Sequence, residues 1–178
     1  RGRGGKSMNR PYGDGTHEKI EGDPTETAPH DTYENMARDY KGPHLTITDE
    51  EDLCAVARYC HVRQTSVWKL ALHDEEGKEK EITVKKTLMC PSGRLTIRDS
   101  ATGEDPEERS PMSLAVLEDP SQNVSGPIWV RGGIPIIGAE GYHYERRNRV
   151  TLCRCGKSTN KPFCDATHLE AGWQDDLY

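Results

Sequence analysis

Hydrophobic and polar residues alternate in several short stretches of this chain, a pattern that is typical of β-strands with one buried face. Leu45 and Ile47, for example, alternate with polar neighbours within residues 44–48. Similar stretches predict further strands at residues 67–72, 95–98, 114–117, 128–130, 134–137 and 149–152, with turns at 74–77, 132–133 and 140–141. Strands therefore prevail toward the C-terminus.

Helical patterns are fewer. Asp49 is a suitable N-cap, and the acidic residues after it favour the positive end of a helix over residues 49–59. Residues 79–89 fit either a helix or a strand, because β-branched residues interrupt the helical pattern. Two segments are predicted to be connections, an acidic linker or lightly anchored segment at 18–43 and a charged loop at 99–111. Together these elements predict an α+β fold.

Composition and charge exclude several classes of protein. Only 33 % of the 178 residues are hydrophobic and 30 % are charged, so small units held together by loops or metal are expected rather than one large core. The net charge of −6 argues against general nucleic-acid binding, which needs a basic face. No stretch approaches the roughly 20 apolar residues of a membrane span.

The spacing of the cysteines near the C-terminus indicates a metal site. Cys153 and Cys155 are separated by one residue, and His168 follows Cys164 by four positions. A histidine at the end of a cysteine cluster is typical of metal ligation rather than of disulfides. Thiols that persist in a reducing compartment usually hold metal or do chemistry, so a cytoplasmic location is predicted.

The residues around these cysteines carry a family resemblance. The pattern reads Cys153-x-Cys155-x-x-Ser158-x-x-x-Pro162-x-Cys164-Asp165-x-Thr167-His168. It resembles the CDGSH iron–sulfur motif of mitoNEET-type proteins, and the match covers every ligand position of that motif. The resemblance implies a small β-rich fold and a 2Fe–2S cluster. The implied ligands are Cys153, Cys155, Cys164 and His168.

This ligand set has chemical consequences. Three thiolates and one neutral imidazole carry less negative charge than four thiolates, so the cluster should be easier to reduce than an all-cysteine centre. The neighbouring cations Arg154, Lys157 and Lys161 would offset the remaining charge. Protons compete for the imidazole of His168 near neutral pH, so we expect the cluster to be lost faster as the pH falls toward about 6.

The motif departs from the family in one position, and spacing alone leaves one alternative open. Ala166 stands where the family normally has Gly. If that position has a positive φ, the alanine adds strain of about 1 kcal/mol. Three cysteines and one histidine are also a suitable ligand set for a structural zinc ion.

The N-terminal end repeats the C-terminal motif without its cysteines. Residues 2–17 align without gaps on residues 153–168, and Gly2, Gly4 and Gly13 stand in place of the three thiols. This degenerate repeat should bind no cluster and serve as a structural partner. The family often pairs two such units around a shared β structure, so we expect a monomer with internal pairing of the repeats, or else a homodimer.

The middle of the chain contains a second group of cysteines, Cys54, Cys60 and Cys90, the last followed by Pro91. Their spacing resembles mono-cluster bacterial ferredoxins, with Ala57 in the place of the middle ligand. The resemblance implies a 3Fe–4S cluster, or a 4Fe–4S cluster completed by water or His61, and a loop rather than a helix at residues 54–60. The alternatives are three buried core cysteines, with Cys54 and Cys60 on one helix face, or a zinc site.

These observations predict three parts and one main function. The parts are a degenerate repeat and linker at 1–43, a divergent ferredoxin-like domain at 44–112, and β strands with the CDGSH domain at 113–178. No nucleotide or nucleophile motif indicates an enzyme. We expect electron transfer, cluster transfer or redox sensing with a redox or cluster-acceptor protein. The alternative is an interaction module with a structural cluster or zinc, using residues 126–137 as an exposed sheet edge.

Overall fold

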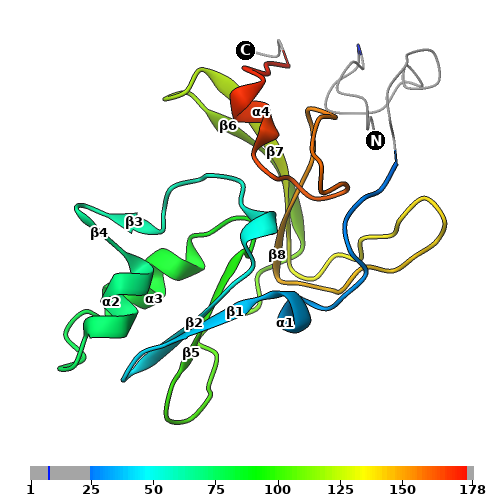
Figure 1. Ribbon diagram of the computed structural model, residues 1–178. Coiled ribbons are helices and arrows are strands. Elements are labelled where there is room, and N and C mark those ends of the chain that lie inside the picture. Colours follow the sequence, from blue (N-terminus) through cyan, green and yellow to red (C-terminus); the bar gives the residue numbers. More distant parts are fainter. Residues whose placement is uncertain (1–7, 9–24, 176–178) are drawn as a thin grey trace.

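The computed structural model describes residue 8 and residues 25–175, and it confirms the α+β class (Figure 1). The first sheet is antiparallel and has the strand order β1-β2-β5. It consists of β1 (Arg38–Lys41), β2 (Leu45–Asp49) and β5 (Leu95–Asp99). The strands predicted at 44–48 and 95–98 are therefore confirmed.

Two helices, α2 (Val67–His73) and α3 (Lys80–Leu88), pack against the first sheet. A small hairpin of β3 (His61–Val62) and β4 (Thr65–Ser66) leads into α2. The apolar side chains between sheet and helices form the first core, whose buried members are Leu45, Ile47, Val67, Ala71, Leu95 and Ile97.

The strand predicted at 67–72 is wrong, because this segment forms helix α2. The side chain of Ser66 accepts a hydrogen bond from the Lys69 amide and caps the helix. Val67, Leu70 and Ala71 lie on its buried face with helical spacing. The β-branched and aromatic residues of this segment favoured a strand, but the helical spacing of its buried positions decided the structure.

The helix predicted at 49–59 is also wrong, since only residues Glu51–Leu53 form a short 3-10 helix, η2. Val56 and Arg58 have φ angles of 51° and 62°, which a helix does not allow. Asp49 does not cap the helix, because its carboxylate accepts two hydrogen bonds from the Arg94 guanidinium. The loop predicted at residues 54–60 is thus confirmed, and the helix-face alternative for its cysteines is wrong.

A second three-stranded sheet lies toward the C-terminus, with the order β6-β7-β8. It consists of β6 (Ser113–Asp119), β7 (Val124–Arg131) and β8 (Arg149–Leu152), and the short helix α4 (Thr167–Glu170) contacts β7. Because β7 is the central strand, residues 126–131 do not form the expected exposed edge. The strand predicted at 134–137 is reduced to an isolated bridge between Ile137 and His143.

The segment before the first sheet is more than a linker. Residues 33–36 form helix α1 (Tyr33–Met36), which leads to β1. Ala28 packs into the second core, whose other buried members are Val130, Ile136, Tyr144, Val150 and Leu152. The predicted degenerate repeat at residues 2–17 lies outside the described residues, apart from position 8.

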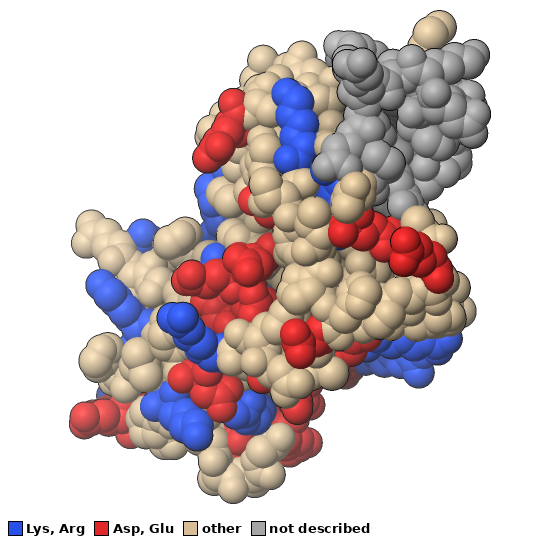
Figure 2. Space-filling view, turned by 45° about the vertical axis from the view of Figure 1, so that its right-hand side comes forward, with Lys and Arg blue, Asp and Glu red and all other residues tan. Residues whose placement is uncertain are grey.

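Charged side chains of both signs are mixed over the face shown in Figure 2, with acidic groups gathered near its centre. Within residues 25–175, no helix has the length and apolar character needed to cross a membrane. The two cores on separate sheets are each small, as the low hydrophobic content of the sequence predicted.

Candidate metal centres

The C-terminal cysteines lie on a loop that starts where β8 ends. The amide of Cys153 donates to the carbonyl of Pro162 (2.9 Å), and the amide of Cys164 donates to the carbonyl of Thr151 (3.0 Å). These two bonds fold the loop back onto β8. Helix α4 then brings His168 beside Cys164.

The four side chains form two pairs. The sulfurs of Cys153 and Cys155 are 3.8 Å apart, and the sulfur of Cys164 is 3.4 Å from Nδ1 of His168. Two thiolates bound tetrahedrally to one metal ion at about 2.3 Å lie about 3.8 Å apart, and a thiolate and an imidazole nitrogen about 3.6 Å apart. Each pair is therefore spaced as two ligands of one tetrahedral metal ion.

Within the described part of the chain, no three His, Cys, Asp or Glu side chains are arranged to hold a single metal ion. A structural zinc ion needs four ligands around one centre. A centre with two metal ions needs two ligands on each, and each pair has the spacing of two such ligands.

The two thiols of the first pair, Cys153 and Cys155, differ in acidity. The hydrogen bond between the sulfurs of Cys153 and Cys155 lowers the pKa of Cys153 to about 6. Hydrogen bonds from the backbone amides of Ser158 and Gly156 also favour the Cys153 thiolate. The same hydrogen bond and burial raise the pKa of Cys155. Burial raises the pKa of Cys164 to about 12. One thiolate is therefore available at neutral pH, and the other thiols gain most from a metal that replaces their protons.

His168 is held in the form that binds metal. Its side chain is 4 % exposed, and burial lowers its pKa although Asp119 and Asp165 act in the opposite direction. The ring is therefore neutral near pH 7, and a neutral imidazole nitrogen is a metal ligand. The nitrogen that faces the Cys164 sulfur is Nδ1.

Asp165 clamps the ligand loop, a role that the sequence analysis did not assign. Its Oδ2 accepts from the amide and hydroxyl of Thr159 (2.7 and 2.8 Å), and its Oδ1 accepts from the amide and hydroxyl of Thr167 (3.1 and 2.7 Å). Burial raises the pKa of Asp165, but these bonds outweigh it and lower the pKa. The Asp-x-Thr pattern, typical of such side-chain-to-backbone turns, was the available signal.

For two further residues of the motif, Ala166 and Arg154, the structure confirms one expectation from the sequence and contradicts the other. Ala166 has a φ of 70°, so the departure from Gly does fall on a left-handed position. The Arg154 side chain, expected to offset cluster charge, is instead paired with two carboxylates, of which Asp175 is buried and Glu118 is exposed. Its guanidinium pairs with Glu118 and Asp175 and lies over the Trp173 ring.

The middle cysteines line one cavity of about 330 Å³ beside the 54–60 loop. Burial and the nearby thiols of Cys90 and Cys54 raise the pKa of Cys60. The same cavity is lined by Ala57 and His61, the positions considered for the missing ligand. The structure thus gathers Cys54, Cys60 and Cys90 around one space.

Arg94 stands beside this cavity and was not found by sequence reasoning. Its guanidinium donates to Asp49 (2.6 and 2.9 Å), and hydrogen bonds to Asp49 and also to Cys54 raise its pKa despite burial. It also lies over the Trp68 ring, 5.5 Å from the centroid. A fixed cation at the cavity wall offsets the negative charge of thiolates bound there.

Comparison with known proteins gives the class of this chain. Residues 125–169 match the family described as iron-binding zinc finger, CDGSH type, and residues 40–100 match the family described as divergent 4Fe-4S mono-cluster. The chain is therefore an iron–sulfur protein. It joins a CDGSH region to a divergent mono-cluster region, which confirms both resemblances seen in the sequence. Searches of curated proteins and of solved structures found no match.

Proposed function

We propose that this chain is a non-enzymatic iron–sulfur protein that carries electrons or passes a cluster to an acceptor protein. The observation that carries the proposal is the paired arrangement of the C-terminal ligands, Cys153 with Cys155 and Cys164 with His168. The pairs support a 2Fe–2S centre, in which each iron takes two ligands from the protein. A structural zinc ion would instead need all four side chains around one centre.

The middle site is proposed to hold a second cluster through Cys54, Cys60 and Cys90. Three thiols around one cavity suit a cluster in which each cysteine binds a different iron. With Ala57 at the fourth position, a 3Fe–4S core is the simplest occupant, and a 4Fe–4S core would need water or His61. The cation Arg94 supports a negatively charged group in this cavity.

The choice between a carrier and an interaction module depends on redox behaviour. A carrier needs centres that change oxidation state without changing the fold. The alternative module relied on residues 126–137 as a free edge, and β7 is a central strand instead. The carrier is therefore the better-supported function.

The experiment that tests the carrier is a reversible redox titration of anaerobically purified protein. Visible absorption and circular dichroism follow the clusters and the fold during reduction and reoxidation. We expect the cluster bands to bleach and return with no change in secondary structure. Clusters that do not respond to reduction, and whose removal only unfolds the chain, would identify the interaction module.

A further inference from the structure

A cleft of about 1010 Å³ lies between the two sheets, and no cysteine of the described part of the chain lines it. The first sheet and helix α1 contribute Tyr33, Thr48 and Thr96 to the lining. The segment at 145–149, which leads into β8, and part of the charged loop at 103–109 complete it. Small-molecule sites usually have volumes of about 300–1,000 Å³, so the cleft has room for a molecule of metabolite size.

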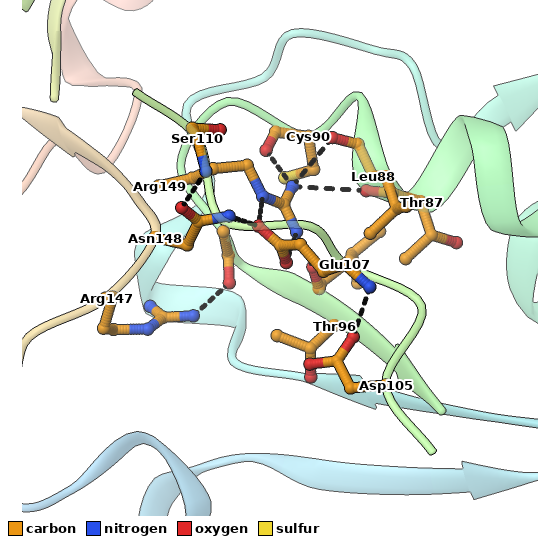
Figure 3. A network of polar contacts seen from close by, with 12 residues as sticks. Thr87, Leu88, Cys90, Thr96, Asp105, Glu107, Ser110, Arg147, Asn148 and Arg149 are labelled. Atoms are coloured by element: carbon orange, nitrogen blue, oxygen red, sulfur yellow. Dashed lines mark hydrogen bonds and ion pairs between the residues drawn. The ribbon is translucent and has the colours of Figure 1, made fainter. Parts of the chain in front are cut away.

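A network of ion pairs and hydrogen bonds fixes part of this lining (Figure 3). Arg149 donates to Glu107 at 2.7 and 2.8 Å, and Asn148 donates to the same carboxylate. On the first sheet, Arg98 pairs with Asp39. Two of the five arginines that line the cleft, and two of its five carboxylates, are therefore used to build it.

The charged groups that remain in the cleft differ in their exposure to water. The three remaining carboxylates are exposed, and they belong to Glu34, Asp105 and Glu145. Two of the remaining arginines, Arg109 and Arg146, are exposed as well, whereas Arg147 is half-buried. Exposed charges are stabilised by water, so the charge that lacks compensation is that of Arg147.

The contacts of Arg147 leave its positive charge without an ionic partner. Within the described residues, Arg147 forms no ion pair, and its Nη2 donates to the carbonyl of Gly93 (Figure 3). Its Nη1 is shielded from solvent and has no hydrogen-bond acceptor among these residues. The guanidinium lies over the Tyr33 ring, 4.0 Å from the centroid.

The electrostatic balance at Arg147 agrees with these contacts. Burial lowers the pKa of Arg147, and this effect exceeds the opposite effects of Tyr33 and Glu145. A buried cation without an opposite charge, and a buried donor without an acceptor, both cost free energy. An anion bound in the cleft would remove both costs.

We propose that this cleft binds a small molecule through a carboxylate or phosphate group, with Arg147 as its main anchor and Arg109 and Arg146 as further contacts. Guanidinium groups bind both kinds of oxyanion through charge-assisted hydrogen bonds. Arg109 reaches the lining at Gly133, where its Nη2 lies 3.5 Å from the position that a Cβ would take. The proposal goes beyond the proposed function, because it does not depend on the clusters that the cysteine sites hold.

The test is equilibrium dialysis of the full chain, purified anaerobically, against radiolabelled inorganic phosphate and, in a separate series, radiolabelled succinate. Sodium chloride keeps the ionic strength constant, because weak binding to exposed charges depends on salt. We expect a single saturable site for at least one of the two anions. Saturation by phosphate alone would identify a phosphate group, and saturation by succinate alone a carboxylate. No saturable binding of either anion would overturn the proposal.

Arg147→Met removes the positive charge and keeps an unbranched side chain of similar length. We expect the affinity for the bound anion to fall by about tenfold or more, because a hydrogen bond to a charged group contributes at least that factor. Arg131→Met is the matched control. Arg131 is also half-buried and lies over an aromatic ring, that of Trp129 at 4.4 Å, but it does not line the cleft. Equal affinities of the two variants would contradict the role of Arg147.

A second variant tests the site without touching a half-buried residue. Arg109→Ala combined with Arg146→Ala changes two exposed side chains that form no ion pair within the described residues, so the circular dichroism should match that of the wild type. We expect the affinity to fall by up to about fivefold for each side chain removed, as is usual for exposed charge pairs. An unchanged affinity would show that the anion is not bound in this cleft.

Discussion

At the scale of single residues, the C-terminal site combines proposed ligands of unequal acidity with one strained backbone position. The thiol of Cys153 ionises readily, whereas burial keeps Cys164 protonated and His168 neutral. The motif predicted which residues meet, but not the direction of each side chain. Arg154 shows the limit, because its neighbours in sequence are proposed ligands while its guanidinium binds Glu118 and Asp175.

The strained position yields a stability prediction. Ala166 adopts a φ of 70°, which costs a residue with a Cβ about 1 kcal/mol relative to glycine. Ala166→Gly should therefore raise the free energy of unfolding by about 1 kcal/mol and slow cluster loss. Denaturant titration of the cluster-loaded protein checks this. Ala139→Gly, at a loop position without a positive φ, is the control and should bring no gain.

The histidine ligand yields a prediction of pH dependence. Burial lowers the pKa of His168 in the folded chain, so the unfolded chain binds its proton more tightly. The folded site therefore loses stability as the pH falls through about 6.5, the ordinary pKa of histidine. We expect the visible absorbance to decay faster at about pH 6 than at about pH 8, and His168→Cys to abolish the difference. Equal decay of the wild type at both values would contradict the assignment of His168.

At the scale of elements, the strands were largely readable from the sequence, while local patterns wrongly predicted a helix around the first middle cysteines, where the family resemblance correctly predicted a loop. β2, β5 and β8 follow the alternation of apolar residues, because each has a face in a core. The segment of helix α2 was predicted to be a strand, since the apolar residues of so short a sequence fit both the two-residue period of a strand and the 3.6-residue period of a helix. The loop at 54–60 departs from a helix because Val56 and Arg58 adopt left-handed conformations, which no local pattern announces.

The clamp between the ligand loop and α4 is testable at this scale. Asp165→Asn replaces one acceptor oxygen by an amide group, so the hydrogen bonds from Thr159 or Thr167 are lost. We expect a loss of about 1–2 kcal/mol in stability of the site and faster release of the cluster. Measuring cluster release to a chelator checks this. Asp105→Asn, whose carboxylate accepts a hydrogen bond from the Glu107 amide (2.8 Å), should leave release unchanged.

At the scale of the whole molecule, two small cores are connected by a buried ion pair. Arg149 at the start of β8 pairs with Glu107 and binds carbonyl groups of the first unit, including that of Leu95 (3.2 Å). Neither residue was recognised from the sequence, because the partners lie far apart in the chain. This contact makes the stability of each unit depend on the other.

The ion pair carries a prediction for the folding of the entire chain. Arg149→Met leaves Glu107 buried without its partner and should lower the free energy of unfolding by about 3 kcal/mol. Adding Glu107→Leu should recover part of that loss, since the unpaired charge is removed. Arg98→Ala, which removes an exposed ion pair, should cost at most about 1 kcal/mol. Equal losses for Arg149→Met and Arg98→Ala would contradict the role of Arg149 as a connection.

The most direct test of the account is the metal and acid-labile sulfide content of anaerobically purified protein, combined with Mössbauer spectroscopy. We predict about five or six irons per chain with a similar amount of sulfide, of which about two irons belong to a 2Fe–2S centre. Cys153→Ser should remove that centre and leave the remaining iron in place. A colourless protein that holds one zinc ion at the Cys153–His168 site would contradict the account.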